Sequence, residues 1–160
     1  MKSKISPILK TLKDLIPLNF SILVEEYEFK LIKNTIWDDW FYDATYQKDN
    51  LYIRIDANTH PRDYPMYFNI VLGEGKIEWP DTDWNSVALW HIAKQIDPNI
   101  KINEYQLKED QQYLEILVHK AKDDLVKYNG GFLEGNLELF YKARKDMNKD
   151  REPYKIHTPN

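Results

Sequence analysis

The segment WFYDATYQKDNLYIRIDA, from Trp40 to Ala57, decides the fold. Large side chains alternate with polar ones on both sides of the polar run QKDN, Gln47–Asn50. Such an alternation places every second side chain on one face of a β-strand, and a short polar run between two strands is typical of a hairpin turn. The sequence therefore predicts two antiparallel strands with a common inner face. The residues predicted to share that face are Trp40, Tyr42, Ala44, Tyr46, Leu51, Ile53 and Ile55.

Further strands are predicted on either side of this hairpin. Residues 20–32 end in an alternation of apolar and charged side chains, which predicts a strand with one solvent-facing side. The first strand of the hairpin is predicted to span residues 35–47. Residues 65–73 are nearly all apolar and predict a more central strand. Residues 77–79 predict a short fifth strand.

Helices are predicted before and after the strands. Ser6 is expected to cap a first helix, which Pro17 is expected to end. Later in the chain, apolar residues recur at helical spacing in three stretches. The three predicted helices run from caps at Asp81, Thr82 or Asp83 to Pro98, from about Tyr105 to Tyr128 with a left-handed stop at Asn129–Gly131, and onward from a cap at Asn136.

A block of strands followed by a block of helices indicates an α+β fold. We expect an N-terminal helix, an antiparallel meander of four to five strands, and three C-terminal helices packed on one sheet face. No linker rich in Gly or Ser marks a boundary, so residues 1–150 are predicted to form a single α+β domain. Residues 151–160 are predicted to be a flexible C-terminal tail.

Composition excludes several classes of protein. The chain has no cysteine, which excludes disulfides and thiolate metal sites and fits a reducing cytoplasm. No apolar run reaches the roughly 20 residues that span a bilayer, so we predict a cytoplasmic protein without a membrane partner. Glycine-rich nucleotide loops and zinc-binding helix motifs are absent from the sequence, and neither a cofactor nor a metal is predicted.

Acidic and aromatic residues are concentrated in the middle of the chain. The net charge is only −4, but residues 36–85 contain ten acidic residues, four basic ones and eleven aromatic rings. Proteins that bind nucleic acid usually have a basic surface instead. The sequence therefore predicts no nucleic-acid partner and favours a basic protein partner, which an acidic surface attracts.

The first candidate site is the motif WDDW, Trp37–Trp40, in which two acids lie between two tryptophans. Neighbouring residues on a strand point to opposite faces, so Asp38 and Asp39 are not expected to act as a carboxylate pair. The tryptophans either pack on the core or anchor a protein interface, where tryptophan and tyrosine are frequent anchors. Both interpretations remain open.

The second candidate site is the polar loop that follows the hairpin. Asp56, His60 and Asp63 are residue types that ligate metals or act in acid–base catalysis. Two prolines make the same loop typical of an ordinary chain reversal. Asp56 also shares a strand side with Arg54, as expected for a surface ion pair. These interpretations also remain open.

Three segments of the chain resemble a known group of proteins. They are LIPLNFSILVEEY (15–27), LYIRID (51–56) and LEGNLELFYKAR (133–144). Their order is similar to that of small uncharacterised bacterial α+β proteins, which are themselves similar to immunity proteins of polymorphic toxin systems. The resemblance implies a cytoplasmic, often acidic protein that blocks a toxin by covering it and that has no catalytic residues.

The leading hypothesis is therefore a non-enzymatic, immunity-like binding protein with an acidic, aromatic surface and a basic partner such as a toxin domain. The predicted partner-binding residues are Trp37, Asp38, Asp39, Trp40, Asp56 and Asp63. One alternative is a metal-dependent or acid–base hydrolase that uses Asp56, His60 and Asp63. Another alternative is a homodimeric structural subunit joined through its aromatic face.

Overall fold

The computed structural model describes residues 4–76, 85–101 and 105–150 and confirms the predicted α+β class. The helices are α1 (Pro7–Asn19), α2 (Ser21–Glu25), α3 (Leu89–Ile96), α4 (Gln111–Leu133) and α5 (Glu138–Asn148), with a 3₁₀ turn, η1, at Pro61–Asp63. The strands are β1 (Lys30–Trp37), β2 (Phe41–Lys48), β3 (Leu51–Asn58), β4 (Tyr67–Glu74), β5 (Ser86–Ala88) and β6 (Tyr105–Gln106).

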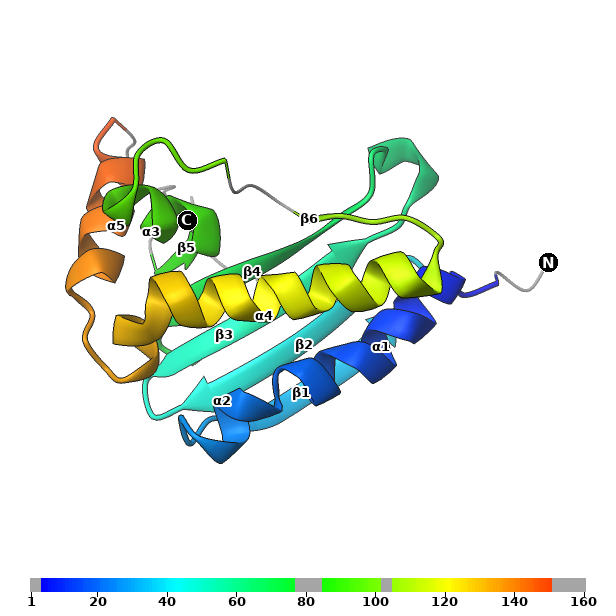
Figure 1. Ribbon diagram of the computed structural model, residues 1–160, viewed down its shortest axis with the longest axis horizontal. Coiled ribbons are helices and arrows are strands. Elements are labelled where there is room, and N and C mark those ends of the chain that lie inside the picture. Colours follow the sequence, from blue (N-terminus) through cyan, green and yellow to red (C-terminus); the bar gives the residue numbers. More distant parts are fainter. Residues whose placement is uncertain (1–3, 77–84, 102–104, 151–160) are drawn as a thin grey trace, which may run out of the picture.

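The strands form an antiparallel sheet in chain order, β1-β2-β3-β4-β5, and β6 pairs with β4 (Figure 1). Strands β2 and β3 pair without a register shift from Phe41 opposite Asn58 to Lys48 opposite Leu51. This pairing confirms the hairpin and the meander that the sequence predicts. The inner face holds the predicted tyrosines and isoleucines, while Leu51 is partly buried.

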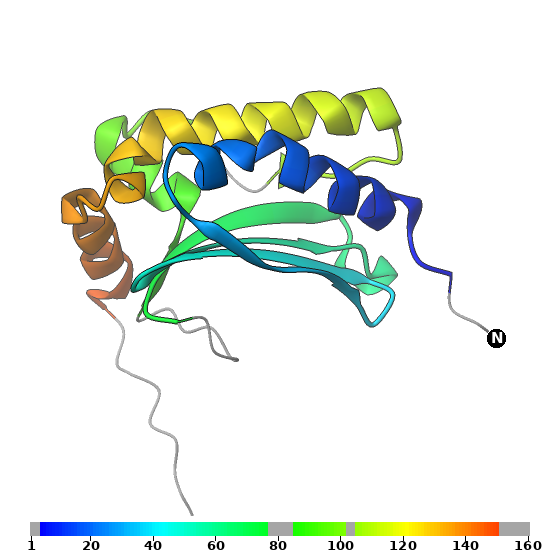
Figure 2. The same cartoon turned by 90° about the horizontal axis from the view of Figure 1, so that it is seen from below.

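Helices α1 and α4 lie side by side across one face of the sheet (Figures 1 and 2). Helices α3 and α5 pack together at the end of the sheet where β5 lies (Figure 1). The predicted N-terminal helix is confirmed as α1. The prediction that all three C-terminal helices pack on one sheet face is only partly met, because α4 lies on that face while α3 and α5 lie at the end of the sheet (Figure 1). Among the described residues no helix crosses the opposite face, which we call the open face (Figure 2).

The hydrophobic core fills the space between the sheet and the helices α1 and α4. Apolar side chains at helical spacing on both helices meet the inner side chains of β2, β3 and β4. The completely buried members include Leu9, Leu12, Ile16, Ile53, Ile55, Ile70, Val118, Ala121 and Leu125. Burial of this apolar area is the main stabilising term of the fold.

The N-terminal helix continues through Pro17, contrary to the prediction that this residue ends it. A proline has no N–H to donate to the carbonyl four residues earlier, which here is that of Lys13. The side chain of Asn34 on β1 donates to this carbonyl instead, at 3.3 Å. Because a replacement donor is present, the helix reaches Asn19 before it ends.

The predicted strand at residues 20–32 is largely wrong. Residues Ser21–Glu25 form the short helix α2, and β1 begins only at Lys30. Phe20 and Leu23 are both completely buried. Their spacing of three residues suits a helix, whereas a strand would place them on opposite faces.

Residues 35–47 form two strands rather than the single predicted strand. The chain reverses at Asp38 and Asp39, which have left-handed φ angles of +54° and +57°. Trp40 therefore lies in the turn and not on the inner face of a strand with Tyr42, as the alternation predicts. Aspartate is among the few non-glycine residues that enter the left-handed region readily.

The second half differs from its prediction at three places. Ser86–Ala88 is a strand, and Tyr105–Gln106 pairs with β4 before α4 begins. Helix α4 kinks at Asn129, where φ is −123° and ψ is 18°, and continues to Leu133 instead of stopping. After the helix ends, the residue with a left-handed backbone conformation is Gly135, whose φ angle is +91°.

The capping role of Asn136 has partial support, because its side chain accepts a hydrogen bond of 3.2 Å from the N–H of Glu138. The predicted strand at 77–79, the predicted caps Asp81, Thr82 and Asp83, and the predicted tail at 151–160 lie outside the described residues. Among the residues that the structure describes, none of the helices combines the length and the apolar character needed to cross a lipid bilayer.

Candidate functional site

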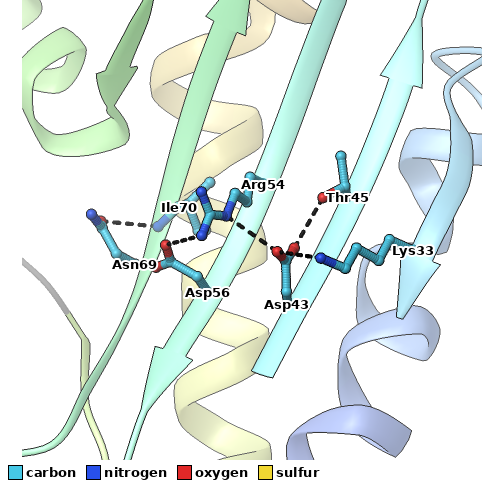
Figure 3. Close-up of polar contacts among 7 residues, drawn as sticks. All are labelled: Lys33, Asp43, Thr45, Arg54, Asp56, Asn69 and Ile70. Carbon is cyan, nitrogen blue, oxygen red and sulfur yellow. Dashed lines mark hydrogen bonds and ion pairs between the residues drawn. The ribbon is translucent and has the colours of Figure 1, made fainter. Parts of the chain in front are cut away.

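The open face carries a line of charged side chains across three neighbouring strands. Thr45 on β2 lies opposite Lys33 on β1 and opposite Arg54 on β3. Asp43 precedes Thr45 by two residues and therefore projects from the same face. The register of the β1-β2-β3 meander thus brings two cations and a carboxylate together on this side of the sheet (Figure 3).

Asp43 is the centre of this line. Its Oδ2 lies 3.2 Å from Lys33 Nζ and 3.4 Å from Arg54 Nε, and its Oδ1 accepts a 3.0 Å hydrogen bond from Thr45 Oγ1. Asp43 is only 5% exposed. A carboxylate in such a position is tolerated when cations and hydrogen bonds compensate for its lost hydration. These contacts therefore have a structural role: they fix the position of the Arg54 side chain on this face of the sheet.

Arg54 also reaches Asp56, with 3.5 Å between its Nη2 and Asp56 Oδ2 (Figure 3). The ion pair that the sequence predicts between these two residues is therefore confirmed. The Asp56 side chain remains 36% exposed, while that of Arg54 is 11% exposed. The cation is thus mostly covered, and the carboxylate of Asp56 is the part of this pair that solvent reaches.

A hollow of about 480 Å³ opens beside Arg54 and Asp56 on the open face. The rings of Trp37 and Phe41 lie on one side of it, stacked with their centroids 4.4 Å apart and their planes at 17°. Tyr67 and Asp63 also line it. The hollow therefore combines aromatic surface with carboxylates at the end of the sheet where β1 turns into β2.

Hydrogen bonds join the β1–β2 turn to the β3–β4 loop at this end of the sheet. Thr59 donates its N–H and its hydroxyl to the carbonyl of Trp40, at 2.8 and 3.0 Å. Asn58 Nδ2 donates to Asp63 Oδ2 at 2.8 Å, and its Oδ1 accepts from the N–H of His60 at 2.8 Å. The turn and the loop are thus held together as one rim of the hollow.

The structure brings three of the six predicted partner-binding residues to the hollow, namely Trp37, Asp56 and Asp63. Asp38 and Asp39 form the turn directly after Trp37 and so belong to the same end of the sheet. They are separate from the charge line of Asp43, which is buried. Among the acidic residues named here, Asp43 is therefore buried in the charge line, whereas the others lie at the hollow or at the turn beside it.

Trp40 and His60 pack edge to face, with their ring centroids 5.3 Å apart. His60 Nδ1 accepts a hydrogen bond of 3.2 Å from the N–H of Arg62, a local contact typical of a loop. Among residues 4–76, 85–101 and 105–150, no three side chains of His, Cys, Asp or Glu come close enough to hold a metal ion. The residues of the hydrolase hypothesis, Asp56, His60 and Asp63, are thus not gathered as a metal site there.

Tyr42 links the floor of the hollow to the helical layer. Its hydroxyl donates a hydrogen bond of 2.7 Å to Asn34 Oδ1, and Asn34 in turn donates to α1. Burial raises the pKa of Tyr42 far above its ordinary value, and the nearby Tyr46 and Asp43 raise it further. Tyr42 is therefore a neutral hydrogen-bond donor at physiological pH rather than an acid or a base.

Phe41, Tyr67 and the buried Asp43 contribute to this region but are missing from the predicted site. Asp43 and Arg54 both occupy polar positions of the alternation in the hairpin, so the correct register would have placed them on one face. Phe41 is not found in this way, because alternation alone predicts that Asp38 and Asp39 belong to a strand, whereas they form a turn.

Comparison of this chain with known protein families, with curated proteins and with solved structures returns no match.

Proposed function

We propose that this protein is a non-enzymatic binding protein of the immunity-like, inhibitory kind. It would bind a basic protein partner through the rim end of its open face, which is the end that carries the β1–β2 turn and the β3–β4 loop. Inhibition would come from occlusion, because the docked protein covers the working surface of its partner. Aromatic rings would supply most of the contact energy, and the rim carboxylates would speed the encounter and set its orientation.

The single observation that carries the proposal is the hollow in which Trp37, Phe41, Asp56 and Asp63 meet. Trp37 is 37% exposed although it is a large aromatic residue. Aromatic residues at the edge of a hollow with a polar rim are the usual composition of a protein interface. The rim is also rigidly built, so that little conformational entropy would be lost on docking.

The contacts of the polar residues favour binding over catalysis. Asp43 is saturated by Lys33, Arg54 and Thr45, and the ring nitrogen Nδ1 of His60 is occupied by a backbone N–H. General acid–base catalysis needs a titratable group that can reach substrate. Asp43 and the Nδ1 atom of His60 are thus engaged in contacts within the fold.

The test is rescue of growth in a bacterial host. The chain is co-expressed with the product of each gene that flanks its own, and growth and complex formation are measured. We expect one flanking product to be toxic alone, to bind the chain, and to be neutralised by it. The double variant D38N/D39N removes two rim charges, and we expect it to weaken binding and to reduce the salt dependence of the association rate.

The matched control is E25Q/E26Q, which removes two charges from exposed residues at the C-terminal end of α2, ahead of the start of β1 at Lys30 and so away from the β1–β2 turn. It should bind and rescue as well as the unmodified chain. The proposal fails if no flanking product binds, or if D38N/D39N and E25Q/E26Q have the same effect on binding and on its salt dependence.

A further inference from the structure

A second hollow, of about 310 Å³, is lined by residues of α3, α4 and α5, and we call it the helix hollow. The three helices lie together at the end of the sheet where β5 lies (Figure 1). Strand β5 pairs with residues 71–73 of β4, whereas Tyr67, at the other end of β4, lines the first hollow. The helix hollow is therefore separate from the interface proposed above.

The lining of the helix hollow is mainly apolar. Ile92, Phe132 and Phe140 are buried members of the core, and Leu139 packs against it. Among the described residues that line the hollow, Glu138 alone is charged, and it is exposed. An ion would have to give up its hydration to enter an apolar space, and the carboxylate of Glu138 also repels anions. These properties favour a small uncharged organic molecule as the ligand.

Asn129 supplies an unpaired polar group at this hollow. The residue lines the hollow and is only 1% exposed. Within residues 4–76, 85–101 and 105–150, neither its Nδ2 nor its Oδ1 has a hydrogen-bond partner, and both atoms are buried. A buried amide without partners is destabilising, because it has lost its hydrogen bonds to water and has gained none in the fold. A molecule that brings both a donor and an acceptor to this amide would therefore be bound favourably.

The backbone at Asn129 allows the amide to reach the hollow. Helix α4 is kinked at this residue, whose φ of −123° and ψ of 18° are non-helical. The last turn of the helix, residues 130–133, begins with two glycines, which are poor helix formers, and Gly131 and Phe132 in this turn line the hollow. A small shift of the turn, or a rotation of the Asn129 side chain, brings the amide into contact with a molecule in the hollow.

We propose that the helix hollow binds a small uncharged molecule that carries a primary carboxamide, and that this group pairs with the side-chain amide of Asn129. A carboxamide donates from its nitrogen and accepts at its oxygen, so two carboxamides can form two hydrogen bonds side by side. A ketone offers only the acceptor. The inference does not depend on the proposed function, since the two hollows share no lining residue among those described.

The first experiment titrates the full chain, labelled with ¹⁵N, with benzamide and with acetophenone. The two probes have nearly the same shape, but in acetophenone a methyl group takes the place of the amide nitrogen. We expect benzamide to shift the amide signals of residues 89–96 and 128–140 and to raise the unfolding temperature of the chain. Acetophenone should bind about tenfold more weakly, because it leaves Asn129 Oδ1 without a donor.

The second experiment repeats both titrations with variants. N129L replaces the amide with an apolar side chain of similar size, and it should remove the preference for benzamide over acetophenone. Without a probe, its unfolding temperature should equal or exceed that of the unmodified chain, because an unpaired polar group is removed. L139W keeps the amide but fills part of the hollow, and it should weaken both probes. The control N99L, at an exposed residue outside the lining, should change neither titration.

The inference is overturned if benzamide and acetophenone bind the unmodified chain equally, or if neither probe shifts the signals of α3, α4 and α5. It is also overturned if N129L retains the preference for benzamide, or if L139W binds both probes as well as the unmodified chain does. A markedly lower unfolding temperature of N129L without a probe would contradict it as well, because the amide would then have a partner within the fold.

Discussion

At the scale of single residues, the buried tyrosines of β2 differ in what their hydroxyl groups contact. The hydroxyl of Tyr42 donates to Asn34, which also satisfies the Lys13 carbonyl that Pro17 leaves without a helical donor. The hydroxyl of Tyr46 is buried and has no hydrogen-bond partner among the residues that the structure describes. Leaving a buried hydroxyl without a partner is destabilising, whereas a satisfied one contributes to stability.

This difference predicts opposite effects for the same substitution. Y42F should lower the free energy of unfolding by about 1 kcal/mol, because it leaves Asn34 without its donor. Y46F should leave the free energy unchanged or raise it by up to about 1 kcal/mol, because it removes an unsatisfied group. Urea unfolding of the two variants measures both values. A loss of stability in Y46F equal to that in Y42F would contradict this account.

At the scale of elements, the β1–β2 turn is the part of the site with the strictest conformational requirement. Asp38 and Asp39 both have positive φ angles. Asparagine enters this region about as readily as aspartate, while a β-branched residue is strongly disfavoured there. The turn therefore tolerates a change of charge but not a change of backbone preference.

The corresponding prediction separates charge from conformation. D38N/D39N should keep the free energy of unfolding within about 0.5 kcal/mol of the unmodified chain, as is usual for surface changes. D38V/D39V should lower it by about 2 kcal/mol or more, because each left-handed residue with a branched side chain costs about 1–2 kcal/mol. Equal stability of the two double variants, measured by urea or thermal unfolding, would show that the turn is not strained in this way.

The sequence predicted the elements whose pattern is purely local. The β2–β3 hairpin follows from strict alternation around a polar turn, and α1 follows from the Ser6 cap and helical spacing. The elements that were misjudged depend on distant contacts. Helix α1 passes Pro17 because β1 supplies a donor, and Ser86–Ala88 forms a strand because β4 offers its edge. No local pattern contains that information.

At the scale of the whole molecule, the two faces of the sheet differ in the elements that cover them and in the side chains that they carry. One face is covered by α1 and α4 and forms the core (Figure 2). The open face carries the charge line (Figure 3). The hollow lies beside that line. Sequence reasoning could place Trp37, Asp56 and Asp63 in an acidic, aromatic region, but their meeting at one hollow depends on how β1, β3 and η1 align.

The buried tyrosines make the molecule sensitive to alkali. Burial is the main cause that raises the pKa values of Tyr42, Tyr46 and Tyr105 far above 10.0, and Asp124 raises that of Tyr105 further. In the unfolded chain these groups lose their protons near pH 10, so the unfolded state gains stability above that pH while the folded state does not. The stabilising contribution is thus fully present below pH 10 and is lost as the pH rises beyond it.

We therefore expect stability to be insensitive to these tyrosines at neutral pH and to fall above about pH 10, by up to roughly 1.4 kcal/mol per pH unit for each of them. Urea unfolding at a series of alkaline pH values measures the slope. Y46F should reduce that slope, because one titrating group is removed. An unchanged slope in Y46F would mean that Tyr46 ionises equally well in both states.

The central claim is that a protein partner covers the rim end of the open face. Amide hydrogen exchange of the chain, alone and in complex with the flanking gene product that binds it, tests this claim most directly. The account predicts slower exchange in the complex at residues 37–41 and 58–67, with α1 and α4 unchanged. Protection confined to the helices α1 and α4, or to the outer edge of β1 away from the turn, would contradict it.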